Sequence, residues 1–308
     1  MADSTTPTIA SEAPRGRAGR RGLNPRNAPG RVLGHHAGMH LTERFSWYDR
    51  EVAWARLGSG PPVVFCHGTP FSSLVWAPFA RALQDSYTVY LWDMPGYGQS
   101  SMTDGHEVDL GVQGELFRDL LRHWELDRPD VVAHDIGGAV SLRTAILHEI
   151  PYRSLMLVDV VAMPPTGSPF FKFVQRHHGV MSQIPDHIHA AIVRAYVQTA
   201  SARGLRDEDL DALVAPWTTA EGKGAFYRQI KETDEIFLEK ISAQLRALDC
   251  PVRILWGTED AWIPVEVANR LGGLIPGATV RRIEGAGHLV QLDAPVEVAS
   301  EVRAWVTR

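Results

Sequence analysis

The stretch DVVAHDIGG, residues 130–138, decides the expected fold. Its first five residues form a short run of the kind found in buried parallel strands, and residues 139–148 have helical character. Between strand and helix, small residues flank Asp135 on a turn that is too tight for large side chains, which is the pattern of a nucleophile elbow. Serine usually occupies the reactive position of such a turn. Because Asp135 stands there, ordinary serine esterase chemistry is excluded at this position.

The alternation of strand and helix extends in both directions from this motif. Strands are predicted at residues 52–57, 62–66, 87–92, 154–161, 252–256 and 279–283, and helices at residues 72–83, 114–124 and 139–148. Strands that alternate with helices form a mainly parallel sheet with helices on both faces. The sequence therefore predicts an α/β fold whose core consists of residues 39–162 and 249–308.

Two segments depart from this alternation. Residues 163–248 show helical spacing, for example at 189–197 and 226–238, and lack strand-like runs, so a helical cap inserted over the sheet is expected. Residues 1–38 combine several arginines with Gly, Pro, Ala and Ser. This composition is typical of a disordered basic tail.

The composition excludes several classes of function. Of the 308 residues, 44% are hydrophobic and 22% are charged, and the net charge of −5 gives no reason to expect a nucleic-acid partner. Cys66 and Cys250 are too few for a disulfide framework or a metal site. No apolar run approaches the roughly 20 residues of a membrane span. We therefore expect a cytoplasmic protein without cofactor or metal, which does not bind membranes and whose partners are a small apolar substrate and water. The sequence does not predict an oligomeric state.

A carboxylate at the elbow predicts a particular chemistry. Asp135 is ionised at neutral pH, so it attacks saturated carbon without a base, and epoxides and carbon–halogen bonds are suitable targets. The product is an alkyl ester of Asp135, which water must hydrolyse with the help of a general base. His288, in the segment GAGH at residues 285–288, is the candidate for that base. A carboxylate should orient its imidazole, and Asp260 follows a predicted strand, with Asp159 as the alternative.

Hydrolysis of the ester passes through a tetrahedral oxyanion, which needs fixed hydrogen-bond donors. The segment HGTP, residues 67–70, follows a predicted strand and has the character of an oxyanion loop. The backbone N–H groups of Thr69 and Ile136 are therefore the expected donors. Three further side chains are expected to line the substrate site: His67, Trp76 and His134.

These motifs together resemble those of the α/β-hydrolase superfamily. The resemblance covers residues 47–305 and rests on HGTP (67–70), DMPGYGQS (93–100), HDIGG (134–138), GTED (257–260) and GH (287–288). An aspartate at the elbow resembles the branch that contains epoxide hydrolases and haloalkane or haloacetate dehalogenases. The resemblance implies an α/β-hydrolase fold with a mostly parallel, doubly covered sheet and an inserted cap.

Each reaction of this branch implies different partner residues. Haloalkane dehalogenases usually hold the halide with a Trp after the nucleophile and an Asn in the His-Gly loop, where this chain has Ile136 and Thr69. The haloacetate type often uses a carboxylate at the position of Asp159. Epoxide hydrolases protonate the opening oxygen with cap tyrosines. Tyr227, within the sequence AFYR, resembles their motif, and Tyr196 is a second candidate.

The sequence favours hydrolysis of an epoxide to a diol through an ester on Asp135. Haloalkane or haloacetate dehalogenation by the same ester route is the alternative. A ligand-binding homologue without turnover is a further alternative, because one fold serves many functions. The set of Asp135, Asp260 and His288 favours an enzyme over such a binding protein.

Overall fold

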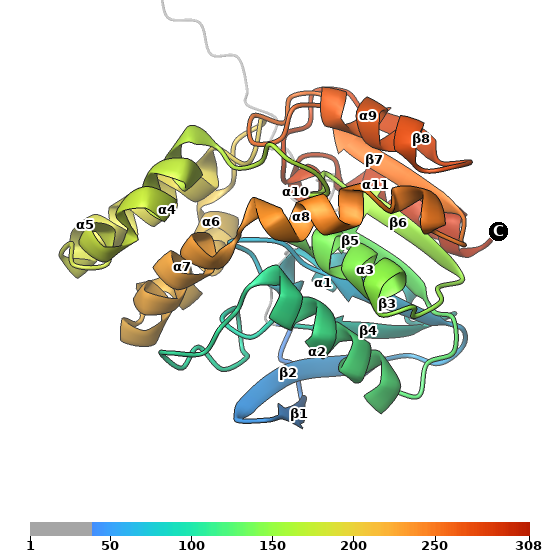
Figure 1. Cartoon of the computed structure of the whole chain (residues 1–308), viewed down its shortest axis with the longest axis horizontal. Coiled ribbons are helices and arrows are strands. Elements are labelled where there is room, and N and C mark those ends of the chain that lie inside the picture. Colours follow the sequence, from blue (N-terminus) through green and yellow to red (C-terminus); the bar gives the residue numbers. More distant parts are fainter. Residues whose placement is uncertain (1–38) are drawn as a thin grey trace, which may run out of the picture. The chain divides into compact units, whose positions relative to one another are not determined.

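A sheet of eight strands forms the centre of residues 39–308, the part of the chain that the computed structural model describes (Figure 1). The strand order is β1-β2-β4-β3-β5-β6-β7-β8. Two strands, β1 (Glu43–Trp47) and β2 (Arg50–Leu57), are antiparallel to their neighbours. The parallel strands are β3 (Pro62–Cys66), β4 (Thr88–Trp92), β5 (Asp130–His134), β6 (Ser154–Val158), β7 (Val252–Gly257) and β8 (Thr279–Ile283). The expected basic tail, residues 1–38, lies outside the described residues.

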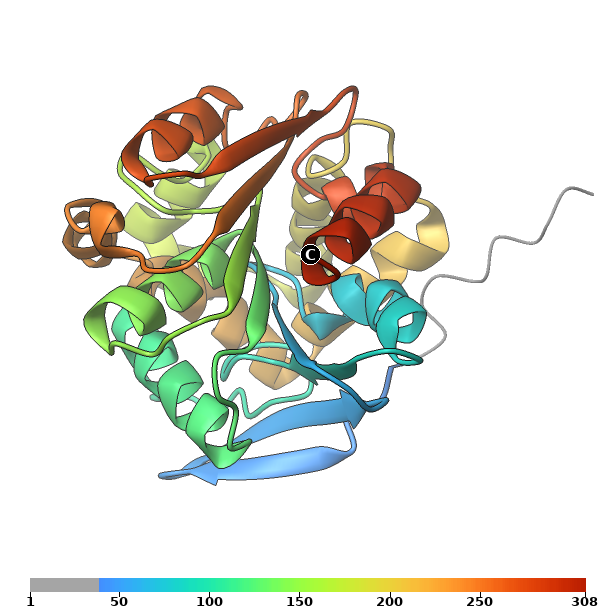
Figure 2. The same cartoon turned by 90° about the vertical axis from the view of Figure 1, so that its right-hand side faces the viewer.

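Helices cover both faces of the sheet, and the burial of the strands follows from this. On one face lie α1 (Ala77–Leu83) and α11 (Pro295–Val306), and on the other lie α2 (Leu110–His123) and α3 (Ile136–Leu147) (Figure 2). Every residue of β4, β5 and β6 is buried, as expected for interior parallel strands, whereas most of the edge strand β8 is exposed. Next to this edge, α9 (Glu266–Leu274) packs on β7 and β8, and the short α10 (Val290–Asp293) precedes α11. The predicted α/β-hydrolase fold is confirmed.

The segment between β6 and β7 is helical. It contains α4 (Pro169–Met181), α5 (Asp186–Gln198), α6 (Asp207–Val214), the 3₁₀ turn η2 (Ala215–Thr218), α7 (Ala220–Glu232) and α8 (Glu235–Ser242). Helices α4 and α7 lie beyond one end of the sheet, whereas α8 packs against α3 (Figure 1). We call residues 163–248 the insertion. Its helices α5 and α7 supply side chains near the ends of the central strands.

Several boundaries differ from the sequence prediction for local reasons. The helical spacing at 226–238 is interrupted, because α7 ends at Glu232 and the Asp234 side chain caps α8 by accepting the Ile236 N–H at 2.9 Å. The strand predicted at 154–161 ends at Val158, because Asp159 has a positive φ of 45°. The helix predicted at 72–83 begins instead as a 3₁₀ turn, η1 (Ser73–Trp76), and continues as α1. The strand β1 was not predicted at all.

Within residues 39–308 no helix has both the length and the apolar composition needed to cross a membrane. The same residues contain no group of three or more His, Cys, Asp or Glu side chains placed to hold a metal ion.

Candidate active site

The turn between β5 and α3 holds Asp135 in a strained backbone conformation. Its φ is 51° and its ψ is −124°, a region that a non-glycine residue rarely adopts. The turn is possible because its neighbours are small. A Cβ on Gly137 would lie 2.4 Å from the carbonyl oxygen of His67, and one on Gly138 would lie 2.4 Å from the Cβ of Val160. The pattern of small residues therefore produces the tight elbow that the sequence predicts.

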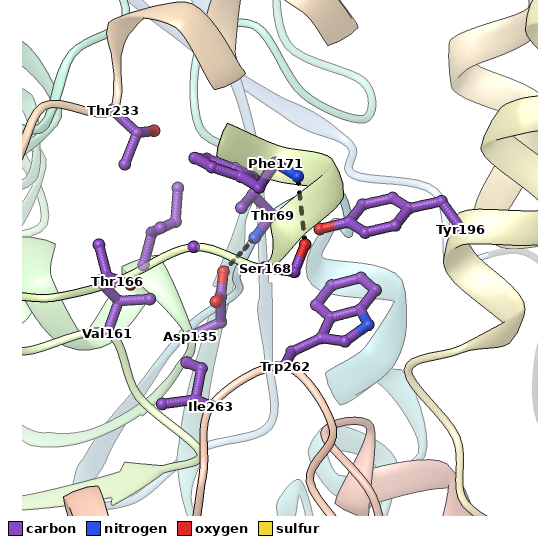
Figure 3. Close-up of a pocket in the computed structure, with 12 residues that line it drawn as sticks. Thr69, Asp135, Val161, Thr166, Ser168, Phe171, Tyr196, Thr233, Trp262 and Ile263 are labelled. Carbon is purple, nitrogen blue, oxygen red and sulfur yellow. Dashed lines mark hydrogen bonds between the residues drawn. The ribbon is translucent and has the colours of Figure 1, made fainter. Parts of the chain in front are cut away.

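The carboxyl group of Asp135 lies between the loop after β3 and His288. The Thr69 N–H donates to Asp135 Oδ1 at 2.6 Å, as Figure 3 shows, and His288 Nε2 lies 3.5 Å from Asp135 Oδ2. Burial opposes ionisation of this carboxyl group, but the hydrogen bond and the charge of His288, together with the Ile136 N–H, hold the pKa of Asp135 below its ordinary value. The side chain is therefore a carboxylate at neutral pH.

Asp260 is the hydrogen-bond partner of His288. Its Oδ2 lies 2.9 Å from His288 Nδ1, while its Oδ1 accepts the backbone N–H groups of Trp262 and Ile263 at 2.8 and 2.9 Å. Burial disfavours the charged imidazole. The Asp260 charge, the hydrogen bond to Asp135 and the hydrogen bond to Asp260 outweigh it and raise the pKa of His288 to about 10. The fixed Asp260 thus holds the imidazole with Nε2 directed at Asp135.

Asp159, the alternative partner of His288, lies behind Asp260. Its Oδ1 accepts the backbone N–H of Gly257 at 2.8 Å, and its side chain is within hydrogen-bonding reach of Asp260. Burial and then the neighbouring Asp260 charge raise the pKa of Asp159 well above its ordinary value. This environment favours the protonated form of Asp159, and Asp260 rather than Asp159 is the partner of His288 Nδ1.

A cavity with an empty volume of about 370 Å³ opens beside Asp135. Its wall is mainly apolar, and Asp135 is the one charged residue in it. The lining residues are Thr69, Asp135, Ile136, Val161, Thr166, Gly167, Ser168, Phe171, Tyr196, Thr233, Trp262 and Ile263 (Figure 3). The cavity thus suits a small, uncharged and largely apolar molecule.

Of the two tyrosines predicted from the insertion, Tyr196 lines the cavity. Its ring stacks on Trp262 with centroids 4.4 Å apart, and Trp262 in turn stacks on His288 at 4.8 Å. Its hydroxyl group points toward Ser168 at the cavity wall (Figure 3). Burial raises the pKa of Tyr196, although the hydrogen bond with Ser168 opposes this, so the phenol is protonated at neutral pH.

Tyr227 requires a correction, because its hydroxyl group does not face the cavity. It donates to His189 Nδ1 at 2.9 Å, while His189 Nε2 donates to the carbonyl oxygen of Trp217 at 2.9 Å. This hydrogen-bonded chain runs within the insertion. The resemblance of the AFYR sequence to a proton-donor motif is therefore not matched by the position of the side chain.

The three side chains predicted to line the substrate site also lie elsewhere. Trp76 is buried in the core, where its Nε1 donates to the carbonyl oxygen of Cys66 at 3.0 Å. His67 accepts the N–H of Met94 at 2.9 Å and so fixes the loop rather than the ligand. His134 Nε2 is 3.0 Å from the carbonyl oxygen of His288, and burial, followed by the His288 charge, lowers the pKa of His134 to about 3. None of these three side chains lines the cavity, and each pairs with a backbone group instead.

Other cavity residues were missed by the sequence prediction. Thr166, Ser168 and Phe171 come from the loop and first turn that open the insertion, and Thr233 follows α7. None of them belongs to a motif or follows a core strand directly. For Thr166, Ser168 and Phe171, the only indication in the sequence was their short distance along the chain from the end of β6.

Comparison with known proteins agrees with this fold. The sequence profile of the α/β hydrolase fold family matches residues 61–295, so the chain belongs to this family, and it is a hydrolase. A solved α/β-hydrolase-fold protein from Burkholderia ambifaria is 44% identical, with a TM-score of 0.85, and the match covers 87% of this chain and 99% of that one.

Two curated relatives carry more specific names. Haloalkane dehalogenase 2 of Mycobacterium tuberculosis is 24% identical over 270 residues, which cover 83% of this chain and 92% of that protein. Epoxide hydrolase 1 of Caenorhabditis elegans is 25% identical over 274 residues, covering 80% of this chain and 65% of that protein. A haloalkane dehalogenase from Agrobacterium tumefaciens, 22% identical with a TM-score of 0.75 over 86% of this chain and 96% of that one, shares the fold.

Replacing Gly137 by alanine should destabilise the protein. The new Cβ would lie 2.4 Å from a backbone oxygen that has no room to move, and overpacking of this kind costs about 1–3 kcal/mol. Gly179→Ala in α4 is the matched control, since a Cβ there meets nothing within 4 Å. It should raise stability by roughly 0.4–1 kcal/mol. Denaturant unfolding measures both, and an undiminished midpoint for Gly137→Ala would contradict the proposed constraint.

Asp260→Asn and Asp159→Asn should have different effects on His288. Removing the charged partner at 2.9 Å should lower the pKa of His288 by more than about one unit. Replacing Asp159, whose protonated form is favoured, by the isosteric amide should change it much less. Titration of the histidine ring resonances by NMR gives both values. A larger shift in Asp159→Asn than in Asp260→Asn would reverse the assignment of the two carboxyl groups.

Proposed function

We propose that this protein hydrolyses small, uncharged, apolar epoxides to diols through a covalent ester on Asp135. The observation that carries the proposal is the ionised Asp135 carboxylate on the elbow, with one oxygen bound by the Thr69 N–H and the other facing His288 at 3.5 Å. In this proposal residues 163–248 act as a cap, which contributes the phenol of Tyr196 to the cavity wall.

In the first step Asp135 Oδ2 attacks a ring carbon of the epoxide. Its other oxygen, Oδ1, stays bound to the Thr69 N–H and becomes the carbonyl oxygen of the ester. The carbon–oxygen bond of the ring breaks, and its electron pair remains on the departing oxygen. That oxygen takes the proton of the Tyr196 phenol, so no free alkoxide has to form.

In the second step His288 removes a proton from water, and the resulting hydroxide attacks the carbonyl carbon of the ester. The Thr69 and Ile136 N–H groups stabilise the oxyanion of the tetrahedral intermediate. Collapse of the intermediate expels the diol alkoxide, which takes the proton from His288. The proton left on the regenerated carboxyl group returns to the Tyr196 phenolate, so the complete reaction consumes one water and releases no proton.

Ester formation also prepares His288 for its role as a base. In the free protein the charges of Asp260 and Asp135 both raise the pKa of His288. An alkyl ester of Asp135 carries no charge, so one of the two anions that stabilise the imidazolium is removed. The pKa of His288 therefore falls when the ester forms, and the imidazolium releases its proton to solvent, which gives the neutral imidazole required for proton abstraction. His288 takes up a proton from solvent again when the Asp135 carboxylate is regenerated, so no net proton is released.

The cavity favours an epoxide over a halide as the substrate. An expelled halide ion needs fixed donors, but Ile136 has an apolar side chain and the Thr69 hydroxyl donates to Gln229 Oε1 at 2.6 Å. The Trp262 Nε1 is likewise occupied by Thr199 at 2.9 Å. No lysine or arginine is among the lining residues, so the carboxylate of a haloacetate would lack a cationic partner.

Haloalkane dehalogenation remains the second candidate, because the Mycobacterium tuberculosis relative that matches 83% of this chain carries that name. The same nucleophile and base would serve. The two reactions differ in their products: dehalogenation releases one halide ion and one proton in each turnover, whereas epoxide hydrolysis releases neither.

A His288→Gln variant should trap the ester. Without the base, the first step proceeds and the second stops, so incubation with a panel of small epoxides and haloalkanes should leave an adduct on Asp135. Mass spectrometry of the peptide that contains Asp135 gives the mass of the adduct and thereby the substrate. Asp135→Ala is the control and should form none. Turnover of an epoxide by the wild type without any adduct in His288→Gln would contradict the proposed mechanism.

The two tyrosines of the insertion should respond differently to loss of their hydroxyl groups. Tyr196→Phe removes the proposed acid and should lower kcat/KM for an epoxide by about 10²–10⁴-fold, the usual contribution of a general acid. Tyr227→Phe interrupts the bond to His189 away from the cavity, so it should leave kcat/KM nearly unchanged while lowering stability. Steady-state kinetics and thermal unfolding measure these effects. The opposite order of activities would restore Tyr227 as the proton donor.

A further inference from the structure

Two buried side chains of the insertion hold the loop that follows β3. The Thr69 hydroxyl donates to Gln229 Oε1 at 2.6 Å, and the Tyr97 hydroxyl donates to the same oxygen at 3.0 Å. One residue further along the loop, the carbonyl oxygen of Pro70 accepts the Trp217 Nε1–H at 2.8 Å. Gln229 lies on α7 and Trp217 on η2, and each is 1% exposed. The insertion therefore contacts the loop by directed hydrogen bonds.

The residue held in this way also supplies a backbone donor to the site. The N–H of Thr69 reaches Asp135 Oδ1 at 2.6 Å. A backbone N–H group has no rotamers, so its direction depends on how the peptide around it is fixed. The side chain of Thr69 is bound to Gln229, and the carbonyl group of the next residue is bound to Trp217. Both anchors lie directly after the Gly68–Thr69 peptide that carries this N–H, and they fix the residue to which the N–H belongs.

The hydrogen bonds from Thr69 and Tyr97 use only the oxygen of the Gln229 amide group. Its Nε2 is buried and has no hydrogen-bond partner among the described residues. A buried donor without a partner costs stability. An apolar side chain of similar size would avoid this cost, but it would leave the buried Thr69 and Tyr97 hydroxyl groups without their acceptor. The contribution of Gln229 must therefore lie in its oxygen, which faces Thr69 and Tyr97.

We propose that Gln229 is a positioning residue for the oxyanion site, which fixes the direction of the Thr69 N–H through the Thr69 hydroxyl group. This inference rests on the proposed ester mechanism. Oxyanion stabilisation is required when the ester is hydrolysed, because the negative charge then develops on Oδ1 of Asp135. Alkylation places no new charge on that oxygen. Gln229 therefore acts on the second step and leaves the first step largely unaffected.

Gln229→Met is the principal variant, because methionine has a similar length and no hydrogen-bonding oxygen. We expect ester hydrolysis to slow by about 10–100-fold, less than the loss of a complete oxyanion donor, while the rate of alkylation stays the same. The Asp135 adduct should then accumulate during turnover although His288 is intact. Rapid-quench mass spectrometry of the Asp135 peptide measures both steps. The thermal midpoint should fall, because the buried Thr69 and Tyr97 hydroxyl groups lose their acceptor.

Thr69→Val tests the same link from the other side. Valine has the shape of threonine and lacks the hydroxyl group, so it should reproduce the effect of Gln229→Met. The double variant should be no slower than either single variant, since both remove one interaction. Thr69→Ser, which keeps the hydroxyl, should restore hydrolysis. Gln198→Met, at a half-buried glutamine of α5 in the same insertion, is the matched control and should leave both steps unchanged.

Hydrogen exchange of the Thr69 amide gives a readout that does not depend on catalysis. Gln229→Met should make this amide exchange faster than in the wild type, whereas Gln198→Met should not. Unchanged exchange together with unchanged hydrolysis would overturn the inference, as would an equal slowing of alkylation and hydrolysis. If wild type and His288→Gln form no adduct with any substrate, the ester mechanism fails, and the exchange measurement still decides whether Gln229 holds the Thr69 N–H.

Discussion

The hydrogen bond from the Thr69 N–H to Asp135 Oδ1 joins the two segments on which the site depends. The strands β3 and β5 are parallel neighbours with Cys66 opposite Ala133, so the loop after one and the elbow after the other leave the sheet at the same edge. Their close approach requires glycine in the loop as well. A Cβ on Gly68 would lie 2.3 Å from the Cβ of Asp135. The strained backbone at Asp135 and the small residues around it thus form one constraint, which sets the position of the carboxylate.

The electrostatics of the site depend on buried carboxyl groups that surround one histidine. Asp135 has a lowered pKa and Asp159 a raised one, while the pKa of His288 is raised to about 10 between its acidic neighbours. In the free protein the charges of Asp260 and Asp135 both raise the pKa of His288. A third anion at Asp159 would be unfavourable in this buried place, and protonation removes it. The protonated form of Asp159 can therefore lie beside Asp260 without adding a charge to the site.

The predictability of each residue depends on how its position is determined. Asp135, Asp260, His288 and Thr69 lie directly after core strands, and the order of the strands brings them together, so a linear motif was sufficient to identify the group. Side chains of the insertion are not placed by the ends of core strands. Helical spacing indicates which residues of α5 and α7 are buried, but both the interior of the insertion and the cavity wall provide buried surroundings.

The contrast between the two tyrosines illustrates this limit. The ring of Tyr196 turns toward the cavity, whereas Tyr227 turns toward His189, and the amphipathic pattern is the same for both. The position of the Trp76 side chain was also not predictable from the pattern, because the 3₁₀ turn η1 directs this side chain into the core. The strand β1 was missed because its burial does not alternate, four of its five residues being at least partly exposed.

The hydrogen bonds of Trp217 and Gln229 to the loop at Thr69 and Pro70 also restrict how molecules reach the cavity. If the whole insertion swung away from the sheet, both bonds would break and the Thr69 N–H would lose its direction in each cycle. Entry that leaves both hydrogen bonds intact would require side chains of the cavity wall to move while the helices stay in place. Under this constraint a slim molecule would reach the carboxylate more easily than a bulky one.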